Sequence, residues 1–526
     1  MNDPIINRQL IHKTSSLCNV CKNVISASVY ADSEKQVWMV KSCDEHGQQQ
    51  VRLSDNADWY QVTRATQPRP TYSSFEVKDV EQGCPFDCGP CTSHQQKTRL
   101  SVVTITSACN LDCPICYVFN KNDNAYHMSI DEFKKTLSKL ERSVDNRIEL
   151  INLTGGDPTL HPDLIKLLEL SNQYNAHRLS LCTNGIKLTQ DEDLLRSIAS
   201  NGARVALSFD SFERGADYTM QAAHLVDLKL KCIDLLEKYK INTTLIPVVA
   251  KGLNDHELGR FIELTLTRPN IRHLEFHTIT FTGQGGKSFD PERKTRISMH
   301  EVLERIEQQC DGVIVKSDFM PSACAHSLCY QVCYLLVDPE GGAPVPFLRF
   351  MDKAQLYDCL KDELYLEPSA KLETALRQAI DSLWIEGSEE STHVLSLLKS
   401  LLGKLFPSER AISQQEALTI SEQRVKTIYI HSHMDEETWD NERIMMCCDS
   451  NCYPDGSSIP VCASNVLYRE TEARFTNAPL DWDTEKAGET MSISVESVSK
   501  MSTVALQAKE KADQVKLTMK NNDSHE

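Results

Sequence analysis

Between residues 100 and 280, short apolar runs alternate with longer amphipathic segments. Runs rich in Val, Ile and Leu predict strands at 100–105, 148–153, 178–182, 204–209, 243–249 and 273–279. Helical spacing of apolar residues predicts helices after Ser129, which forms a capping box with Glu132, and near 162–174, 192–200, 222–239 and 255–266. Six strand–helix units in a row predict a parallel sheet, and six rather than eight predict an incomplete barrel.

Polar residues lie at the carboxyl ends of these strands, where the active sites of such barrels are found. Cys109 follows the first strand, Asp157 the second and residues 183–185 the third, while Ser208 and Asp210 end the fourth. We therefore expect these side chains to meet at one end of the barrel.

Three cysteines, Cys109, Cys113 and Cys116, have the spacing C-x3-C-x2-C, and Tyr117 follows at once. Thiolates bind iron–sulfur clusters, and three of them leave one iron of a four-iron cluster open to a small molecule. The alternatives are a zinc knuckle and a ferredoxin-type cluster whose fourth cysteine lies elsewhere.

This stretch resembles the radical S-adenosylmethionine (SAM) superfamily, and residues 154–158, Thr-Gly-Gly-Asp-Pro, resemble its Gly-Gly-Glu-Pro motif. The resemblance implies that the three cysteines bind a catalytic [4Fe-4S] cluster. It implies SAM-binding roles for Tyr117, Gly155, Gly156, Asp157, Ser208 and Asp210. A carboxylate at position 157 could hold the ammonium group of SAM, although aspartate is one methylene shorter than glutamate. A plain turn or a helix cap is the alternative for these polar positions.

Cys84, Cys88 and Cys91 repeat the C-x3-C-x2-C spacing, and His94 follows. This copy follows no predicted strand, so we assign it to an auxiliary cluster, with a structural zinc site as the alternative.

Near the amino terminus, Cys18, Cys21 and Cys43 predict a mononuclear zinc or iron site around a hairpin at 27–40. His46 is the nearest candidate for a fourth ligand, and an exposed histidine without a metal is the alternative.

Cysteines return late in the chain, and we predict that they hold further clusters. The candidate ligands are Cys324, Cys329, Cys333, Cys447 and Cys462. We expect a metal-binding region at 1–98, the barrel core at 99–315, an auxiliary-cluster region at 316–470 and a polar, flexible tail at 471–526.

The net charge of −18 argues against nucleic-acid binding, which needs clustered Lys and Arg. The 20 cysteines occur in C-x2-C and C-x3-C groups, which suit metals in a reducing compartment better than disulfides. No signal peptide or transmembrane run is evident, so we expect a cytoplasmic protein. An apolar helix face at 394–405 could contact a membrane surface, but a core helix is the expected interpretation.

The order of motifs resembles the branch that contains the tetraether-lipid synthases and pterin methyltransferases. The predicted fold is therefore α/β: a partial (β/α)6 radical SAM barrel with a small N-terminal metal-binding module and a C-terminal cysteine-rich α+β region. The resemblance implies SAM cleavage by a one-electron reductant such as flavodoxin or ferredoxin, followed by C–C coupling or methylation at an unactivated carbon of a lipid-like or small heterocyclic substrate. The alternatives are a peptide-modifying maturase and a non-catalytic iron–sulfur protein.

Overall fold

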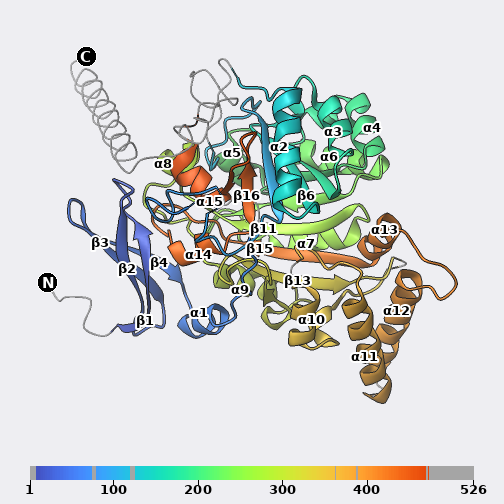
Figure 1. The fold of residues 1–526 in the computed structure, drawn as a ribbon. Coiled ribbons are helices and arrows are strands. Elements are labelled where there is room, and N and C mark those ends of the chain that lie inside the picture. Colours follow the sequence, from blue (N-terminus) through green and yellow to red (C-terminus); the bar gives the residue numbers. More distant parts are fainter. Residues whose placement is uncertain are drawn as a thin grey trace, which may run out of the picture.

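The computed structural model describes residues 8–73, 79–89, 91–118, 125–339, 341–361, 363–386, 389–469 and 472 of the 526-residue chain. Of the expected tail at 471–526, only residue 472 lies within this set. Two sheets organise the described residues: a four-stranded antiparallel sheet near the amino terminus and a much larger mixed sheet (Figure 1).

The small sheet is formed by the first four strands in chain order. They are β1 (Gln9–Leu17), β2 (Val24–Ala31), β3 (Val37–Cys43) and β4 (Gly47–Ser54). The expected hairpin is β2–β3, and its turn is held by Asp32, whose carboxylate accepts the backbone N–H groups of Glu34 and Gln36 at 2.9 Å. Helix α1 (Ala57–Arg64) follows and is capped by the side chain of Asn56.

All six strands expected in the barrel are present and lie side by side in parallel. They are β5 (Leu100–Thr106), β6 (Ile148–Gly155), β7 (Ala176–Thr183), β8 (Arg204–Ser208), β9 (Thr243–Ile246) and β11 (Ile271–Thr278). The run expected at 243–249 is interrupted at Pro247, which has no N–H for the ladder, and resumes as β10 (Val248–Val249).

Helices follow the strands where the periodicity predicts them, and α5 is an additional helix that it did not predict. They are α2 (Ile130–Ser143), α3 (Leu164–Ser171), α4 (Glu192–Ser200), α5 (Arg214–Gln221), α6 (Val226–Lys238) and α7 (Leu258–Thr267). The capping box before α2 is complete: Ser129 accepts from the N–H of Glu132, and the Glu132 carboxylate accepts from the N–H of Ser129.

The C-terminal region extends the same sheet at both of its edges. Strand β15 (Val425–His431) pairs in parallel with β11, and β16 (Asp449–Cys452) pairs in parallel with β5. Strand β13 (Tyr330–Leu336) adds outside β15, and β12 (Met320–Pro321), β14 (Val345–Pro346) and β17 (Ser458–Pro460) complete the sheet. His431 Nε2 at the end of β15 lies only 3.7 Å from Asp449 Oδ2 at the start of β16. The sheet therefore curls until β15 and β16 approach each other. The boundaries expected at 99–315 and 316–470 stay predictions, since one sheet draws on both regions.

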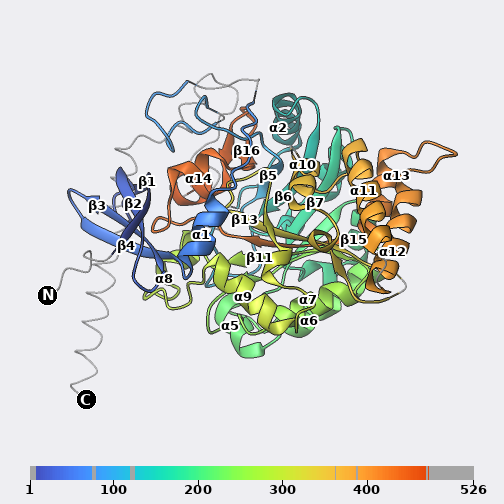
Figure 2. The same cartoon turned by 90° about the horizontal axis from the view of Figure 1, so that it is seen from below.

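The remaining helices cover the C-terminal half of the molecule. They are α8 (Gly283–Ser288), α9 (Met299–Gln309), α10 (Lys353–Cys359), α11 (Ala370–Glu386), α12 (Glu389–Leu405), α13 (Gln414–Arg424), α14 (Asn441–Met445) and α15 (Val461–Ala463). Figures 1 and 2 place α11 and α12 together at the end of the molecule away from the small sheet. The apolar face at 394–405 is largely buried here, as expected for a core helix. Within the described residues, no helix has the length and apolarity to cross a membrane.

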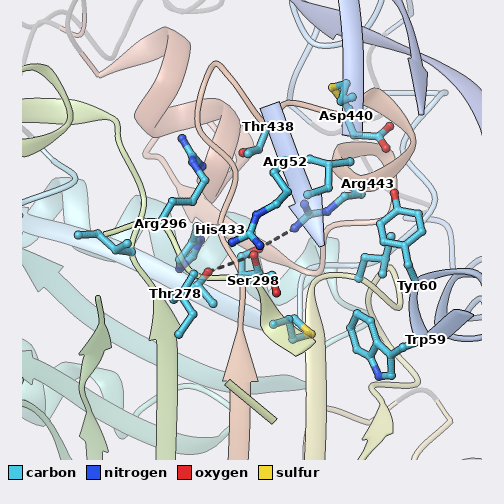
Figure 3. A pocket seen from close by; sticks show the side chains of 17 residues that line it. Arg52, Trp59, Tyr60, Thr278, Arg296, Ser298, His433, Thr438, Asp440 and Arg443 are labelled. Carbon is cyan, nitrogen blue, oxygen red and sulfur yellow. Dashed lines mark hydrogen bonds between the residues drawn. The ribbon is translucent and has the colours of Figure 1, made fainter. Parts of the chain in front are cut away.

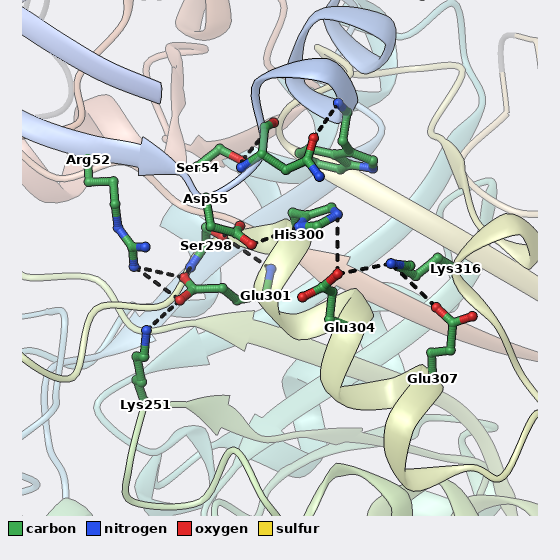
Figure 4. A network of polar contacts seen from close by, with 12 residues as sticks. Arg52, Ser54, Asp55, Lys251, Ser298, His300, Glu301, Glu304, Glu307 and Lys316 are labelled. Atoms are coloured by element: carbon green, nitrogen blue, oxygen red, sulfur yellow. Dashed lines mark hydrogen bonds and ion pairs between the residues drawn. The ribbon is translucent and has the colours of Figure 1, made fainter. Parts of the chain in front are cut away.

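A polar network joins the small sheet to the barrel (Figure 4). Arg52 and Lys251 both donate to the carboxylate of Glu301 on α9. Beside them, Asp55 accepts from the Ser298 hydroxyl at 2.7 Å and lies 2.9 Å from His300 Nδ1. Burial alone would raise the pKa of Asp55, but the contacts with His300 and Ser298 lower it to about 2. This network fixes the N-terminal module against α9.

Candidate functional site

A cavity of about 260 Å³ opens inside the barrel at the carboxyl ends of its strands. It brings together the three cysteines of the loop after β5, the Gly155–Gly156 turn after β6, and Ser208 and Asp210 after β8. Tyr117 lines it as well. The expected site residues therefore converge, with the exception of the Asp157 carboxylate.

Glycines hold the cysteine loop in place by allowing close backbone contact. A Cβ atom on Gly156 would lie 2.2 Å from the carbonyl oxygen of Ala108, and one on Gly155 would lie 2.0 Å from that of Thr106. On the other side, the N–H of Gly285 donates to the carbonyl of Cys116 at 2.7 Å. The Gly-Gly turn and the loop after β11 thus clamp the cysteine loop between them.

The cysteine loop has the chemistry needed to hold a cluster. The thiols of Cys109, Cys113 and Cys116 are partly exposed and face the cavity, and burial raises the pKa of Cys109 to about 11. Such thiols become thiolates only when a metal is bound. The loop supplies three thiols, which fits a four-iron cluster with one open iron; Cys182 at the end of β7 lines the same cavity but is not part of this loop.

The Asp157 carboxylate is buried behind the Gly-Gly turn and does not line the cavity. It accepts from the backbone N–H groups of Thr159 and Asn184, both at 2.9 Å, and from the Thr183 hydroxyl at 2.8 Å. These donors tie the ends of β6 and β7 together. The expected contact with the SAM ammonium stays a prediction, and the geometry favours a positioning role.

Replacing Asp157 with Ala should destabilise the protein by about 1–3 kcal/mol, because the Thr183 hydroxyl and the Asn184 N–H lose their buried acceptor. Asp157→Asn retains one carbonyl acceptor and should recover part of that loss. Urea unfolding and calorimetric titration with SAM distinguish the two roles. A variant with native stability but weakened SAM binding would instead place the carboxylate on the ammonium group.

Asp210 shapes the far end of the cavity. Its carboxylate accepts from the N–H of Val248 at 2.9 Å and from the side chain of Gln221, and burial raises its pKa. Ser208 lines the same wall. Behind them, the buried ammonium of Lys229 donates to the carbonyl of Asn184 at 2.7 Å. A SAM contact for Ser208 and Asp210 stays a prediction.

Part of the cavity wall is polar, and sequence reasoning did not single out the residues of this polar wall. It reaches the cysteine loop, since His433 stacks on Tyr117 at a centroid distance of 5.5 Å. It carries Glu275, His277, Tyr330, His431, His433, Asp449, Asn152 and Asn451. His277 is the last residue but one of the sixth strand, so the strand-end rule that selected Ser208 could also have selected it. Glu275 and Asn152 lie within predicted strands, β11 and β6, but short of their ends. The others depend on β13, β15 and β16, which the sequence pattern did not place in the barrel.

The N-terminal cysteines form a compact metal-binding group that includes His46. The ligand atoms of Cys18, Cys21, Cys43 and His46 all lie within 4.8 Å of one another. His46 Nδ1 is 3.5 Å from the Cys43 sulfur and 3.7 Å from that of Cys18. Three thiols and one imidazole fit a tetrahedral zinc or iron site.

Cys84, Cys88 and Cys91 line one small cavity between their own loop and α14, together with His94. His94 Nε2 lies 2.8 Å from the carbonyl oxygen of Cys447, so the loop is attached to the C-terminal region. Their role as an auxiliary cluster stays a prediction.

The structure groups the late cysteines in a way that their spacing in the sequence does not show. Cys329, Cys447, Cys448 and Cys462 line one small cavity beside His433, which also borders the main cavity. Cys324 does not line this cavity, but its sulfur lies 3.7 Å from that of Cys448. Cys333 is fully buried in the apolar core of the barrel, so the structure does not bring it to the other expected ligands.

His433 also borders a third cavity, at the junction of the small sheet and the barrel (Figure 3). This cavity measures about 60 Å³, and Arg52, Trp59, Arg296 and Arg443 line it. The N-terminal module therefore packs directly over the wall that carries His433.

Comparisons with known proteins agree with this geometry. Residues 103–265 match the model of the radical SAM superfamily, and residues 10–55 match that of the HMPTM N-terminal zinc ribbon domain. The chain is 27% identical to the 7,8-dihydro-6-hydroxymethylpterin dimethyltransferase of Methanocaldococcus jannaschii over 89% of this chain and 96% of that protein.

Other matches cover less of the chain. The GTP 3′,8-cyclase of Clostridium acetobutylicum is 30% identical over 38% of this chain and 61% of its own length. Among solved structures, SuiB of Streptococcus suis bound to S-adenosylmethionine is 13% identical over 40% of this chain and 48% of that chain, with a TM-score of 0.33.

Superfamily membership implies a [4Fe-4S] cluster and SAM at the cavity, where the three cysteines and the Gly-Gly turn fit both. The expected α/β fold with a cysteine-rich N-terminal module is confirmed. Residues 103–265 form a radical SAM domain, and the findings together support a radical SAM enzyme similar to the superfamily's pterin-methyltransferase-like branch.

Proposed function

We propose that this enzyme methylates an unactivated carbon of a small, polar heterocycle. A 5′-deoxyadenosyl radical removes a hydrogen atom from that carbon, and a second SAM supplies the methyl group while a second electron from the reductant converts its sulfonium to a thioether. Similarity to a pterin dimethyltransferase along nearly the whole chain supports this proposal. The observation that carries it is the polarity of part of the cavity wall.

Two asparagines face the cavity from one row of the sheet. Asn451 on β16 pairs with Val102 on β5, which pairs with Asn152 on β6, so the two amides stand at one level. The side-chain oxygens of both are buried, and neither has a hydrogen-bond partner within the described part of the chain. A buried acceptor without a donor costs about 1–3 kcal/mol, so a ligand that supplies N–H groups is favoured here.

This wall discriminates between the two substrate classes expected from the sequence. An alkyl chain would leave the two amide oxygens and the carboxylates of Glu275 and Asp449 facing apolar atoms. A heterocycle with ring N–H and amino groups would donate to them. The geometry therefore favours the heterocycle over the lipid.

The protein's own contribution is to bind, orient and exclude water. A reduced [4Fe-4S] cluster, when bound at Cys109, Cys113 and Cys116, would supply the electron that cleaves SAM to methionine and the 5′-deoxyadenosyl radical. The cavity encloses the radical's target between the cysteine loop and the polar wall. We infer that a flavodoxin or ferredoxin supplies the electron, and that the enzyme works in the cytoplasm. Additional clusters at Cys84, Cys88 and Cys91, and at Cys329, Cys447 and Cys462, are part of this proposal.

Binding of 7,8-dihydro-6-hydroxymethylpterin tests the proposal. Replacing Asn152 and Asn451 together with Leu should weaken pterin binding about 10-fold or more, because two buried amides are lost. The exposed Asn172→Leu serves as the control and should bind as the wild type does. Calorimetry under anaerobic conditions measures binding, and mass spectrometry after addition of SAM and reductant detects the methylated product.

Equal binding by the wild type and the double variant would contradict the proposal. So would a wild-type enzyme that modifies a long-chain lipid or a peptide from cell extract and leaves the pterin unchanged.

A further inference from the structure

Three histidines of the polar wall lie close enough to bind one metal ion. His277 is the last residue but one of β11, His431 is the last residue of β15, and His433 lies two residues after His431. One ring nitrogen from each lies within 4.8 Å of the others. The ring centroid of His277 is 5.0 Å from that of His431 and 5.1 Å from that of His433. This group is separate from the cysteine ligands of the catalytic loop.

Glu275 determines which nitrogens are available. His277 Nε2 lies 3.0 Å and His431 Nδ1 3.2 Å from the same oxygen of the Glu275 carboxylate. A carboxylate only accepts, so His431 directs its Nδ1–H toward Glu275, and the lone pair of His431 is on Nε2. His277 Nε2 makes no hydrogen bond with Glu275 despite the 3.0 Å distance, so His277 keeps a nitrogen lone pair for a metal ion. A carboxylate behind a histidine is the usual partner of a metal-binding imidazole.

Asp449 supplies a fourth candidate ligand. Its Oδ2 lies 3.7 Å from His431 Nε2, which is too far for a hydrogen bond. With the lone pair of His431 on this nitrogen, two acceptors face each other across the gap. Ligand atoms bound at about 2.1 Å in tetrahedral geometry are roughly 3.4 Å apart, so the gap suits a metal ion. The Tyr330 hydroxyl and the Cys448 thiol donate to the Asp449 carboxylate.

His433 can present its second nitrogen to the same point. Its Nδ1 lies 3.7 Å from the Cys462 sulfur, which leaves Nε2 for the cavity. The His433 ring is tilted by 41° relative to that of His431, at a centroid distance of 3.9 Å. It borders both the main cavity and the junction cavity of Figure 3.

We propose that His277, His431, His433 and Asp449 bind one divalent transition-metal ion in the wall of the SAM cavity. Three imidazoles and a carboxylate suit Zn²⁺ or Fe²⁺. The ion would lie in the wall of the cavity that the cysteine loop also lines, where it would act on the substrate as a Lewis acid that orients an oxygen or ring nitrogen. The site goes beyond the proposed function and does not depend on the identity of the heterocycle.

Zinc content tests this site without an activity assay. The anaerobically reconstituted enzyme is exposed to Zn²⁺, desalted, and analysed for zinc and iron by mass spectrometry. His277→Gln with His433→Gln should bind one zinc per chain fewer than the wild type and keep its iron. The control His256→Gln, an exposed histidine paired with Glu213, should bind as much zinc as the wild type. Equal zinc in all three proteins would overturn the proposal.

The double variant could misfold and lose iron as well as zinc. In that case, X-ray absorption at the zinc edge of the wild-type enzyme tests the site. Zinc in the N-terminal group alone would show about three sulfur ligands for each nitrogen. A second zinc at the proposed site should raise nitrogen and oxygen ligands above sulfur. A spectrum that shows three sulfur ligands for each nitrogen or oxygen ligand would contradict the site.

Discussion

The variant with Ala in place of Cys109, Cys113 and Cys116 is expected to form no detectable 5′-deoxyadenosine. These thiols are the proposed cluster ligands in the cavity that also carries the Gly-Gly turn, so their removal should leave SAM without an iron to bind. The reconstituted variant should contain one four-iron cluster less than the wild type. Iron analysis and chromatography of the products after addition of dithionite measure both effects.

The second C-x3-C-x2-C copy provides a matched control. Replacing Cys84, Cys88 and Cys91 with Ala should also lower the iron content, but SAM cleavage should survive, because this loop lines a separate cavity beside α14. The yield of methylated product should fall. If the Cys109 variant still cleaved SAM and the Cys84 variant did not, the catalytic cluster would belong to Cys84, Cys88 and Cys91 instead.

The barrel could be predicted because its strands are buried on both faces, while each of its helices buries one face. Runs such as 148–153 therefore carry a strong apolar signal, and each expected strand is present within about three residues of its expected ends. Strand β16, Asp449–Cys452, gives no such signal. It is short and polar, and its place beside β5 follows from tertiary contacts.

The cysteine ligands show the same limit. Local spacing identified the loop at Cys109 and the N-terminal group, where the ligands come from one turn or hairpin. Spacing failed for Cys329 and Cys333, which lie four residues apart near and within β13 but face different surroundings. Only the fold brings Cys329 to Cys447 and Cys462 from more than 100 residues away.

Glu422→Ala is expected to cause the largest loss of stability of any single substitution considered. Glu422 on α13 accepts from Arg178 on β7 and Arg204 on β8, and its own backbone carbonyl accepts from Arg272. All lie near the amino ends of their strands, away from the cavity. Removing the carboxylate leaves two largely buried guanidinium groups short of a counter-charge, which costs about 3–5 kcal/mol for a buried pair.

The matched control is Glu416→Ala on the same helix, since Glu416 pairs with Arg410 in solvent. It should leave the unfolding midpoint in urea unchanged, whereas Glu422→Ala should lower it strongly. If Glu422→Ala had the same unfolding midpoint as Glu416→Ala, Glu367 alone would be sufficient to neutralise the arginines, since it also pairs with Arg178.

The pH dependence separates charge from packing at Glu422. Burial would raise the pKa of this carboxyl, but Arg204 and Arg178 hold it below the ordinary value. A lowered folded pKa means that the charge contributes fully above the unfolded pKa of about 4.3 and is lost as pH falls through the folded value. The difference in stability between wild type and Glu422→Ala should therefore be constant from pH 7 down to about 5 and shrink below it. A difference that persists in acid would arise from packing, because only the charge is removed by protonation.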